Sequence, residues 1–278
     1  MSNVLGWTWG GRKGKMAAMN TKWMIGVAAL ALASWCAAAA PARAEGTAAE
    51  RLAKSFEAVR SLSCEIRRDK PLPDGGTART LSRVMWQRPG RLNSETVQPL
   101  PRRTVSDGTV FRQYIKGADK GFSRPVAELD AAMLAGLRVV PGANLELLGP
   151  LCGLPEEPLE APADGGARFG YEAPSGTYSV LQLDAEGRWV ALEVYGSRAM
   201  TDRRVLAAYS DFAEVAPGAW IACRQESQLW LEGLSSAETV RLSQVRANIE
   251  LPAATFDGAA FFPGVEFVDS FDKITFRE

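Results

Sequence analysis

Few side chains in this chain could do catalytic chemistry, and they form no recognised pattern. Histidine, the commonest general base and a frequent zinc ligand, is absent from all 278 residues. Asp107, Asp202 and Asp211 lie near the ends of predicted strands, but no spacing pairs them for glycoside hydrolysis. The sequence contains no G-x-S-x-G, H-E-x-x-H or G-x-G-x-x-G motif. We therefore expect no enzymatic activity, no catalytic residues, no bound metal and no cofactor.

The first 44 residues have the pattern of an export signal. Four basic residues precede Trp23–Ala40, an uncharged run of eighteen residues, and Ala42-Arg43-Ala44 then offers an A-x-A cleavage site. The alternative is an uncleaved anchor, since a membrane-spanning helix needs about 20 apolar residues. The alanine content of the run and the cleavage site favour removal of residues 1–44. We therefore predict that the mature chain, residues 45–278, is periplasmic and has no stable membrane span.

The charge balance of the mature chain argues against nucleic-acid binding. The whole chain has 32 basic and 32 acidic residues, and five of the basic ones lie in residues 1–44. Removal of that segment leaves 27 basic against 32 acidic residues, a net charge of −5. A nucleic-acid-binding domain would instead be basic. Residues 45–278 suit one large β domain or two small ones, and they are long enough to bury a substantial core.

Three cysteines, Cys64, Cys152 and Cys223, remain in the mature chain. An oxidising compartment allows one disulfide with one thiol left over. Burial of all three as small apolar residues is the other interpretation. No C-x-x-C spacing occurs, so a zinc ribbon or a thioredoxin-type motif is not predicted.

Turn signals divide most of the mature chain into short extended runs. Asp107-Gly108 between two such runs predicts a hairpin, and Arg88-Pro89-Gly90 ends the extended run Val84–Gln87. From Arg168 onward the chain reads as a meander of six strands, which would pair antiparallel. We predict about ten or eleven strands in all. A twisted sheet of that width curls, so the predicted fold class is mainly β with helices (α+β), built on one large curved antiparallel sheet.

Two segments are predicted to be helical and one to be a loop. Glu45–Ser61 is amphipathic and would cover one face of the sheet. Val126–Leu137 is rich in Ala, Leu and Met, with Ser123 as its cap. The proline-rich segment 149–166 is predicted to be a loop, and loops of that length are uncommon unless they are functional.

Two ordered sets of motifs resemble the LolA family of periplasmic lipoprotein carriers. The first is Trp86-x-Arg-Pro-Gly-Arg-Leu followed by Val105-Ser-Asp-Gly and Tyr114. The second is Leu251-Pro252 followed by Phe256 and Phe262-Pro-Gly-Val. Together they extend the resemblance over nearly all of the mature chain. It implies a single LolA-like domain whose sheet forms an unclosed half-barrel, with helices covering the concave side and an apolar cavity beneath them.

The resemblance also implies a function and a set of partners. It implies a periplasmic carrier that binds lipoprotein acyl chains or other lipid for transfer toward the outer membrane. The partners would be the acylated ligand, an inner-membrane release complex and an outer-membrane receptor. Arg91, Asn93 and Glu95 depart from the aromatic residues common in the family. The alternative is a non-catalytic sensor or interaction module on the same fold, of the RseB type, that binds a membrane-protein partner.

The candidate ligand-binding residues follow from the same resemblance. It implies that the Arg88 guanidinium hydrogen-bonds to a lid, for which Val126–Leu137 is the candidate, and so stabilises a closed state. The alternative for Arg88 is a solvated ion pair with Glu95. The apolar strand faces could equally be plain core. The candidates for the acyl cavity and its lid are Arg88, Trp86, Met133, Leu134, Leu137, Val190, Leu192, Val194 and Leu229.

Overall fold

The structure, a computed structural model, describes residues 46–231 and 234–276, so the predicted signal segment lies outside the described residues. Over those residues it contains one 14-stranded sheet, in the order β14-β6-β5-β4-β3-β2-β1-β13-β12-β11-β10-β9-β8-β7. The strands are β1 (Ser61–Pro71), β2 (Thr77–Gln87), β3 (Arg91–Gln98), β4 (Arg102–Asp107), β5 (Val110–Ile115), β6 (Gly121–Pro125), β7 (Glu156–Pro158), β8 (Ala167–Glu172), β9 (Tyr178–Leu183), β10 (Trp189–Tyr195), β11 (Arg203–Ala216), β12 (Ala219–Leu231), β13 (Leu234–Ala247) and β14 (Phe267–Val268).

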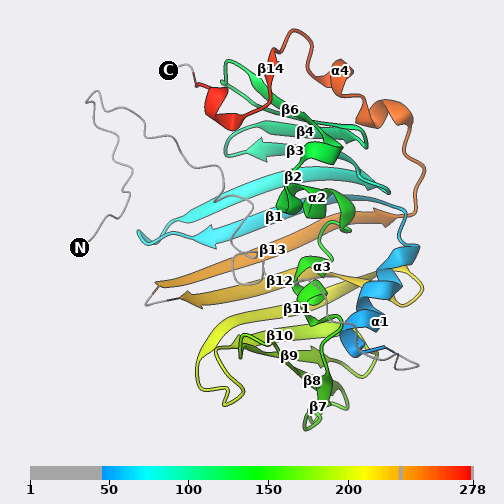
Figure 1. The fold of residues 1–278 in the computed structure, drawn as a ribbon, viewed down its shortest axis with the longest axis vertical. Coiled ribbons are helices and arrows are strands. Elements are labelled where there is room, and N and C mark those ends of the chain that lie inside the picture. Colours follow the sequence, from blue (N-terminus) through cyan, green and yellow to red (C-terminus); the bar gives the residue numbers. More distant parts are fainter. Residues whose placement is uncertain (1–45, 232–233, 277–278) are drawn as a thin grey trace.

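The sheet is not closed into a barrel, because β14 and β7 end it on opposite sides (Figure 1). This confirms the predicted fold class of an unclosed, mainly antiparallel half-barrel with helices. The strand count was too low, because short strands such as β7 and β14 leave little pattern in a sequence. One pairing also differs from the prediction, since β14 runs parallel to β6.

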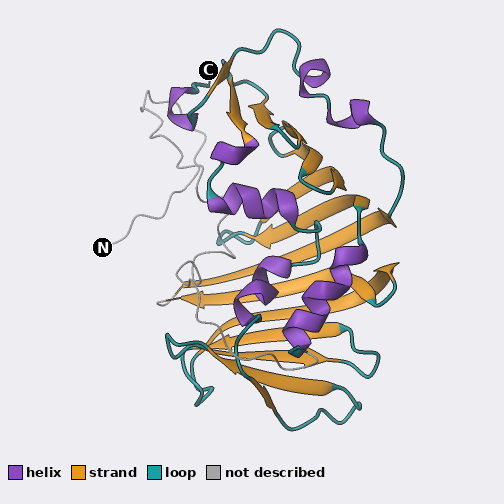
Figure 2. Ribbon diagram, turned by 45° about the vertical axis from the view of Figure 1, so that its right-hand side comes forward, coloured by secondary structure: helices purple, strands orange, loops and turns teal. Residues whose placement is uncertain are grey.

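The helical segments are short, and α1, α2 and α3 lie on one face of the sheet, here called the helix-covered face (Figure 2). They are α1 (Ala48–Ser55), α2 (Ala131–Arg138), α3 (Leu145–Leu148), α4 (Gly258–Phe261), and the 3₁₀ turns η2 (Phe56–Ala58), η3 (Val126–Glu128), η4 (Gly149–Leu151), η5 (Ala253–Phe256) and η6 (Phe271–Lys273).

A capping box fixes the start of α1. The Thr47 hydroxyl accepts from the amide of Glu50, and the Glu50 carboxylate accepts from the amide of Thr47 at 2.7 Å. This helix lies within the predicted Glu45–Ser61 segment and is shorter than predicted. The prediction placed the start of the second helix wrongly. Asp130 caps α2, while Ser123 belongs to β6.

The predicted hairpin at Asp107-Gly108 is present between β4 and β5. The Asp107 carboxylate accepts from the amides of Thr109 at 2.7 Å and Val110 at 2.8 Å. Gly108 has a φ of +93°, a conformation that glycine adopts without a steric penalty. The proline-rich segment 149–166 contains η4 and the edge strand β7.

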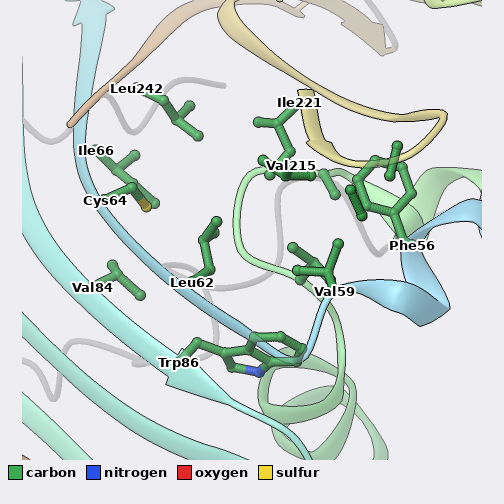
Figure 3. Close-up of a cluster of buried hydrophobic side chains, with 14 of the residues drawn as sticks. Phe56, Val59, Leu62, Cys64, Ile66, Val84, Trp86, Val215, Ile221 and Leu242 are labelled. Atoms are coloured by element: carbon green, nitrogen blue, oxygen red, sulfur yellow. The ribbon is translucent and has the colours of Figure 1, made fainter. Parts of the chain in front are cut away.

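The main core lies between the helix-covered face and the segments packed on it. One cluster joins β1, β2 and β11–β13 to η2 and to Val140 and Ala143 of the loop after α2. Figure 3 shows its side chains, which include Leu62, Trp86 and Ile221. A second cluster joins α1 and α3 to β8–β12, and a third joins α2 to β5 and β6.

The Cys64 thiol is expected not to react in the folded protein. Burial raises its pKa to about 12, with a smaller contribution from Cys223, so almost no thiolate forms at neutral pH. Strand β13 separates β1 from β12, which places these two cysteines roughly 9–10 Å apart or more, beyond the span of a disulfide. All three cysteines of residues 46–276 are free in the structure.

Mass spectrometry after iodoacetamide treatment checks this prediction. The peptide that contains Cys64 should stay unmodified in native protein at pH 7 and become fully modified in urea. Labelling of Cys64 in the native protein at the denatured rate would contradict its burial.

Candidate binding interior beneath the helices

Trp86 joins the sheet to α2. Its indole is completely buried, and it packs with Leu62 and Val84 on the helix-covered face (Figure 3). The indole Nε1–H donates to the carbonyl of Leu137 at 2.7 Å. Because this carbonyl is in the last turn of α2, the bond satisfies a group that the helix itself leaves without a partner.

Arg88 joins the sheet to η2. Its Nε donates to the carbonyl of Val59 at 2.8 Å, and its Nη2 donates to the carbonyl of Phe56 at 3.1 Å. The guanidinium also lies 5.5 Å from the ring centre of Trp86. It therefore holds backbone carbonyls, but these belong to the segment after α1 and not to the predicted lid Val126–Leu137. The bond to the predicted lid comes from Trp86.

The three candidate residues of α2 face the third core cluster. Leu137 is 1% exposed, while Met133 and Leu134 are half-buried against the same cluster. That cluster includes Phe111 and Phe122 from β5 and β6. The structure thus brings these three residues together along one side of α2, the helix that Trp86 holds at Leu137.

The candidates on β10 and β12 do not form one group. Leu192 and Val194 belong to the second cluster, together with Trp189. The pairing of β10 with β9 is irregular between Trp189 and Ala191. A bulge changes which residues share a face, and this explains why Trp189 joins Leu192 and why Val190 lies outside the described clusters.

Leu229 also lies outside these clusters. It is half-buried and shares a face of β12 with Gln225, because residues four apart in a strand point to the same side. The structure therefore places Leu229 on the helix-covered face, apart from the other candidates.

Gln225 is a polar residue of this face that the sequence analysis did not select. It is 7% exposed, and its Nε2 donates to the carbonyl of Gly142 at 2.8 Å. Its Oε1 accepts from Nδ2 of Asn144 at 2.9 Å. Gln225 thus joins β12 to the loop between α2 and α3. A signal was present in the sequence, since Gln225 interrupts an apolar alternation that begins at Ile221.

Trp86, Arg88 and Gln225 are here called the three anchoring residues. Each projects from the sheet or its end and bonds to backbone in a different part of the layer above: α2, η2 and the loop between α2 and α3. The layer is therefore held at separate points by hydrogen bonds as well as by apolar packing.

Removal of the Gln225 amide is expected to loosen that loop. In a Gln225→Leu variant the buried carbonyl of Gly142 loses its partner, which should lower the free energy of unfolding by about 1–3 kcal/mol. Amide hydrogen exchange should accelerate in residues 139–145. The matched control is Gln228→Leu, since Gln228 lies exposed on the opposite face of β12. Equal effects of the two substitutions on exchange would contradict the anchoring role.

Two hollows border the layer. One of about 10 Å³ is lined by eight residues of the loop and the sheet: Gly142, Ala143, Asn144, Trp189, Tyr209, Phe212, Trp220 and Ala222. The other is an open hollow of about 500 Å³ lined by Ala58, Arg60, Ser61, Gln87, Asn248, Ile249 and Glu250. The first has room for about one water molecule. An acyl chain would thus enter beneath the helices only if the layer moved.

Two further features bear on the class of protein. Within the described ranges, no helix is long and apolar enough to cross a membrane. The same residues contain no group of three or more acidic, cysteine or histidine side chains arranged to hold a metal ion.

Comparisons with known proteins gave matches among solved structures. No family model matches the chain, and no curated protein matches it. A LolA superfamily protein, NE2245 from Nitrosomonas europaea, aligns over 77% of this chain and 97% of its own, with 10% identity and a TM-score of 0.48. A DUF1329 family protein from Desulfovibrio piger aligns over 77% of this chain and 95% of its own, with 12% identity and a TM-score of 0.48. The chain is similar to both of these solved structures, at low sequence identity.

Proposed function

We propose that this chain is a periplasmic carrier that binds lipoprotein acyl chains, or another lipid, beneath its helices for transfer toward the outer membrane. The observation that carries the proposal is the hydrogen-bonded attachment of the layer over an apolar sheet face. Trp86, Arg88 and Gln225 all bind backbone groups that water could bind instead. Water can therefore replace each anchoring hydrogen bond when the layer lifts from the sheet.

The energies involved are compatible with a lipid that opens the layer. Each anchoring hydrogen bond contributes about 0.5–1.5 kcal/mol net, so release of all of them costs on the order of 5 kcal/mol. Burial of one methylene contributes about 0.8 kcal/mol, so an acyl chain with about ten buried methylenes gains roughly 8 kcal/mol. An acyl chain that takes the place of the layer's apolar side chains on the sheet can therefore also offset the loss of the anchoring hydrogen bonds, whereas a small polar molecule cannot.

The interior also supports a second candidate function. The side chains of the core clusters fill the space beneath the helices, and the hollow among them has a volume of only about 10 Å³. A filled interior suits a sensor or interaction module that binds a membrane-protein partner with its outer surface.

Native mass spectrometry of mature protein purified from the periplasm separates the two functions. We expect co-purifying lipid or acylated peptide, identified by extraction from the same sample. The purified protein is then mixed with a diacylglyceryl peptide and, as a control, with the same peptide without acyl chains. Binding of the acylated peptide alone supports the carrier. If only the free protein is detected in both mixtures, the result favours the interaction module. Capture of a membrane protein by the lipid-free chain would favour it too.

A further inference from the structure

Tyr209 of β11 is a buried polar group that the proposed carrier function does not yet use. Its side chain is 7% exposed, and its hydroxyl has no hydrogen-bond partner among the residues that the structure describes. The Asn144 amide donates to Gln225 and lies close enough to favour the ionised phenol, but as a donor it supplies no acceptor for the hydroxyl hydrogen. A buried hydroxyl without a partner is rare in folded proteins, and each instance calls for an explanation.

The surroundings of Tyr209 are mostly aromatic. It lines the hollow beneath the Gly142–Asn144 loop, and its ring centre lies 4.5 Å from that of Trp189. Phe212 and Trp220 line the same hollow. Gln225 holds the loop that closes it, so the hollow lies at one of the three anchoring points. Release of that anchor would open the hollow directly.

The charges near the hollow favour a neutral ligand group. Burial and the carboxylate of Glu146 raise the pKa of the Tyr209 phenol, which therefore stays protonated and can donate. One cation beside the hollow is Arg188, whose guanidinium lies 5.0 Å from the ring centre of Phe212. Its guanidinium already binds Asp184 at 2.6 Å and Glu186 at 3.0 Å. An anionic group would thus compete with Asp184 and Glu186 for the Arg188 guanidinium, whereas a neutral carbonyl would accept directly from the Tyr209 hydroxyl.

We propose that Tyr209 and the aromatic residues around it form a polar subsite that accepts the ester or amide carbonyl of a bound acyl ligand. The proposal rests on the proposed carrier function and names the ligand group that this part of the site recognises. The hydrocarbon chain would lie along the apolar helix-covered face, and the Tyr209 hydroxyl would donate one hydrogen bond to the carbonyl. This subsite would distinguish an acylated molecule from a plain hydrocarbon.

Displacement of the fluorescent probe N-phenyl-1-naphthylamine tests the subsite, with methyl laurate and n-pentadecane as competing ligands of similar size. The Tyr209→Phe variant keeps the ring and removes the hydroxyl. We expect it to bind methyl laurate about three- to tenfold more weakly than the wild-type chain, as the loss of one hydrogen bond predicts. Its affinity for n-pentadecane should not change, and its melting temperature should not fall.

Tyr171→Phe is the matched control, because the Tyr171 hydroxyl is also buried but donates to Glu156 at 2.6 Å. This variant should keep the wild-type preference for the ester. The proposed subsite is contradicted if Tyr209→Phe weakens the binding of methyl laurate and n-pentadecane equally, or weakens the binding of neither. The proposal is also contradicted if Tyr209→Phe lowers the melting temperature and leaves both affinities unchanged. That result would indicate that the hydroxyl binds a trapped water molecule. If the wild-type chain binds neither ligand, the carrier function itself fails.

Discussion

A Trp86→Ala variant is expected to lose about 3–5 kcal/mol of unfolding free energy, the largest effect of any single substitution considered for this chain. The indole is completely buried in the main core, and its removal leaves a cavity between β2 and the end of α2. It also leaves the carbonyl of Leu137 without its donor. Urea denaturation followed by circular dichroism measures the change.

Two further variants separate the contributions to this effect. Trp86→Phe keeps most of the apolar contact and removes the hydrogen bond, so it should lose only about 1–2 kcal/mol. Trp230→Ala removes a tryptophan of β12 that is only half-buried and lies beside Arg203. It should lose about 1 kcal/mol or less, as is usual for a substitution outside the core. A Trp86→Ala loss no larger than that of Trp230→Ala would contradict the central place of Trp86.

An Arg88→Met variant is expected to lose about 2–3 kcal/mol of unfolding free energy and to release the segment after α1. Methionine retains an unbranched apolar side chain, but it cannot donate to the carbonyls of Val59 and Phe56. Hydrogen exchange of the peptide that covers residues 52–60 should accelerate by tenfold or more, since 1.4 kcal/mol corresponds to a factor of ten. If the layer opens for ligand, uptake of a fluorescent fatty acid should also accelerate.

Two substitutions serve as controls for the Arg88 prediction. Arg88→Lys should restore little of the stability that Arg88→Met loses, because an ammonium group cannot reproduce the fixed fork of the guanidinium that reaches two carbonyls. Arg91→Met removes a nearby guanidinium whose described hydrogen bond is a 3.4 Å contact with Gln87, so exchange over residues 52–60 should stay at the wild-type rate. Equal exchange in Arg88→Met and wild-type protein would show that Arg88 does not hold the segment.

Local features of the fold could be predicted from the sequence, whereas distant contacts could not. Asp107-Gly108 specifies its hairpin with residues that are all neighbours in the chain, and the structure has that hairpin. Trp86 and Arg88 stand out by their motif, but the groups they bind are 51, 29 and 32 residues away. No residue near Arg88 in the sequence indicates that its hydrogen-bond partners are Phe56 and Val59.

The errors in the candidate site have equally specific causes. An alternation of period two placed Val190 with Leu192 and Val194, and the irregular pairing beside Val190 breaks that alternation. Gln225 interrupts an apolar alternation of β12, and a polar residue in such a position can hold a distant loop. Its partners, Gly142 and Asn144, are more than eighty residues earlier in the chain.

The pairing of β1 with β13 affects how the chain reaches its native state. Strands β1–β6 pair with their neighbours in sequence, as do β7–β13, and this one ladder joins the two series in the middle of the sheet. When the chain emerges N-terminus first, one edge of β1 therefore stays unpaired until β13 has emerged. Open strand edges promote aggregation, and late long-range pairing slows folding. We expect folding yield to depend on protection of that edge by a chaperone.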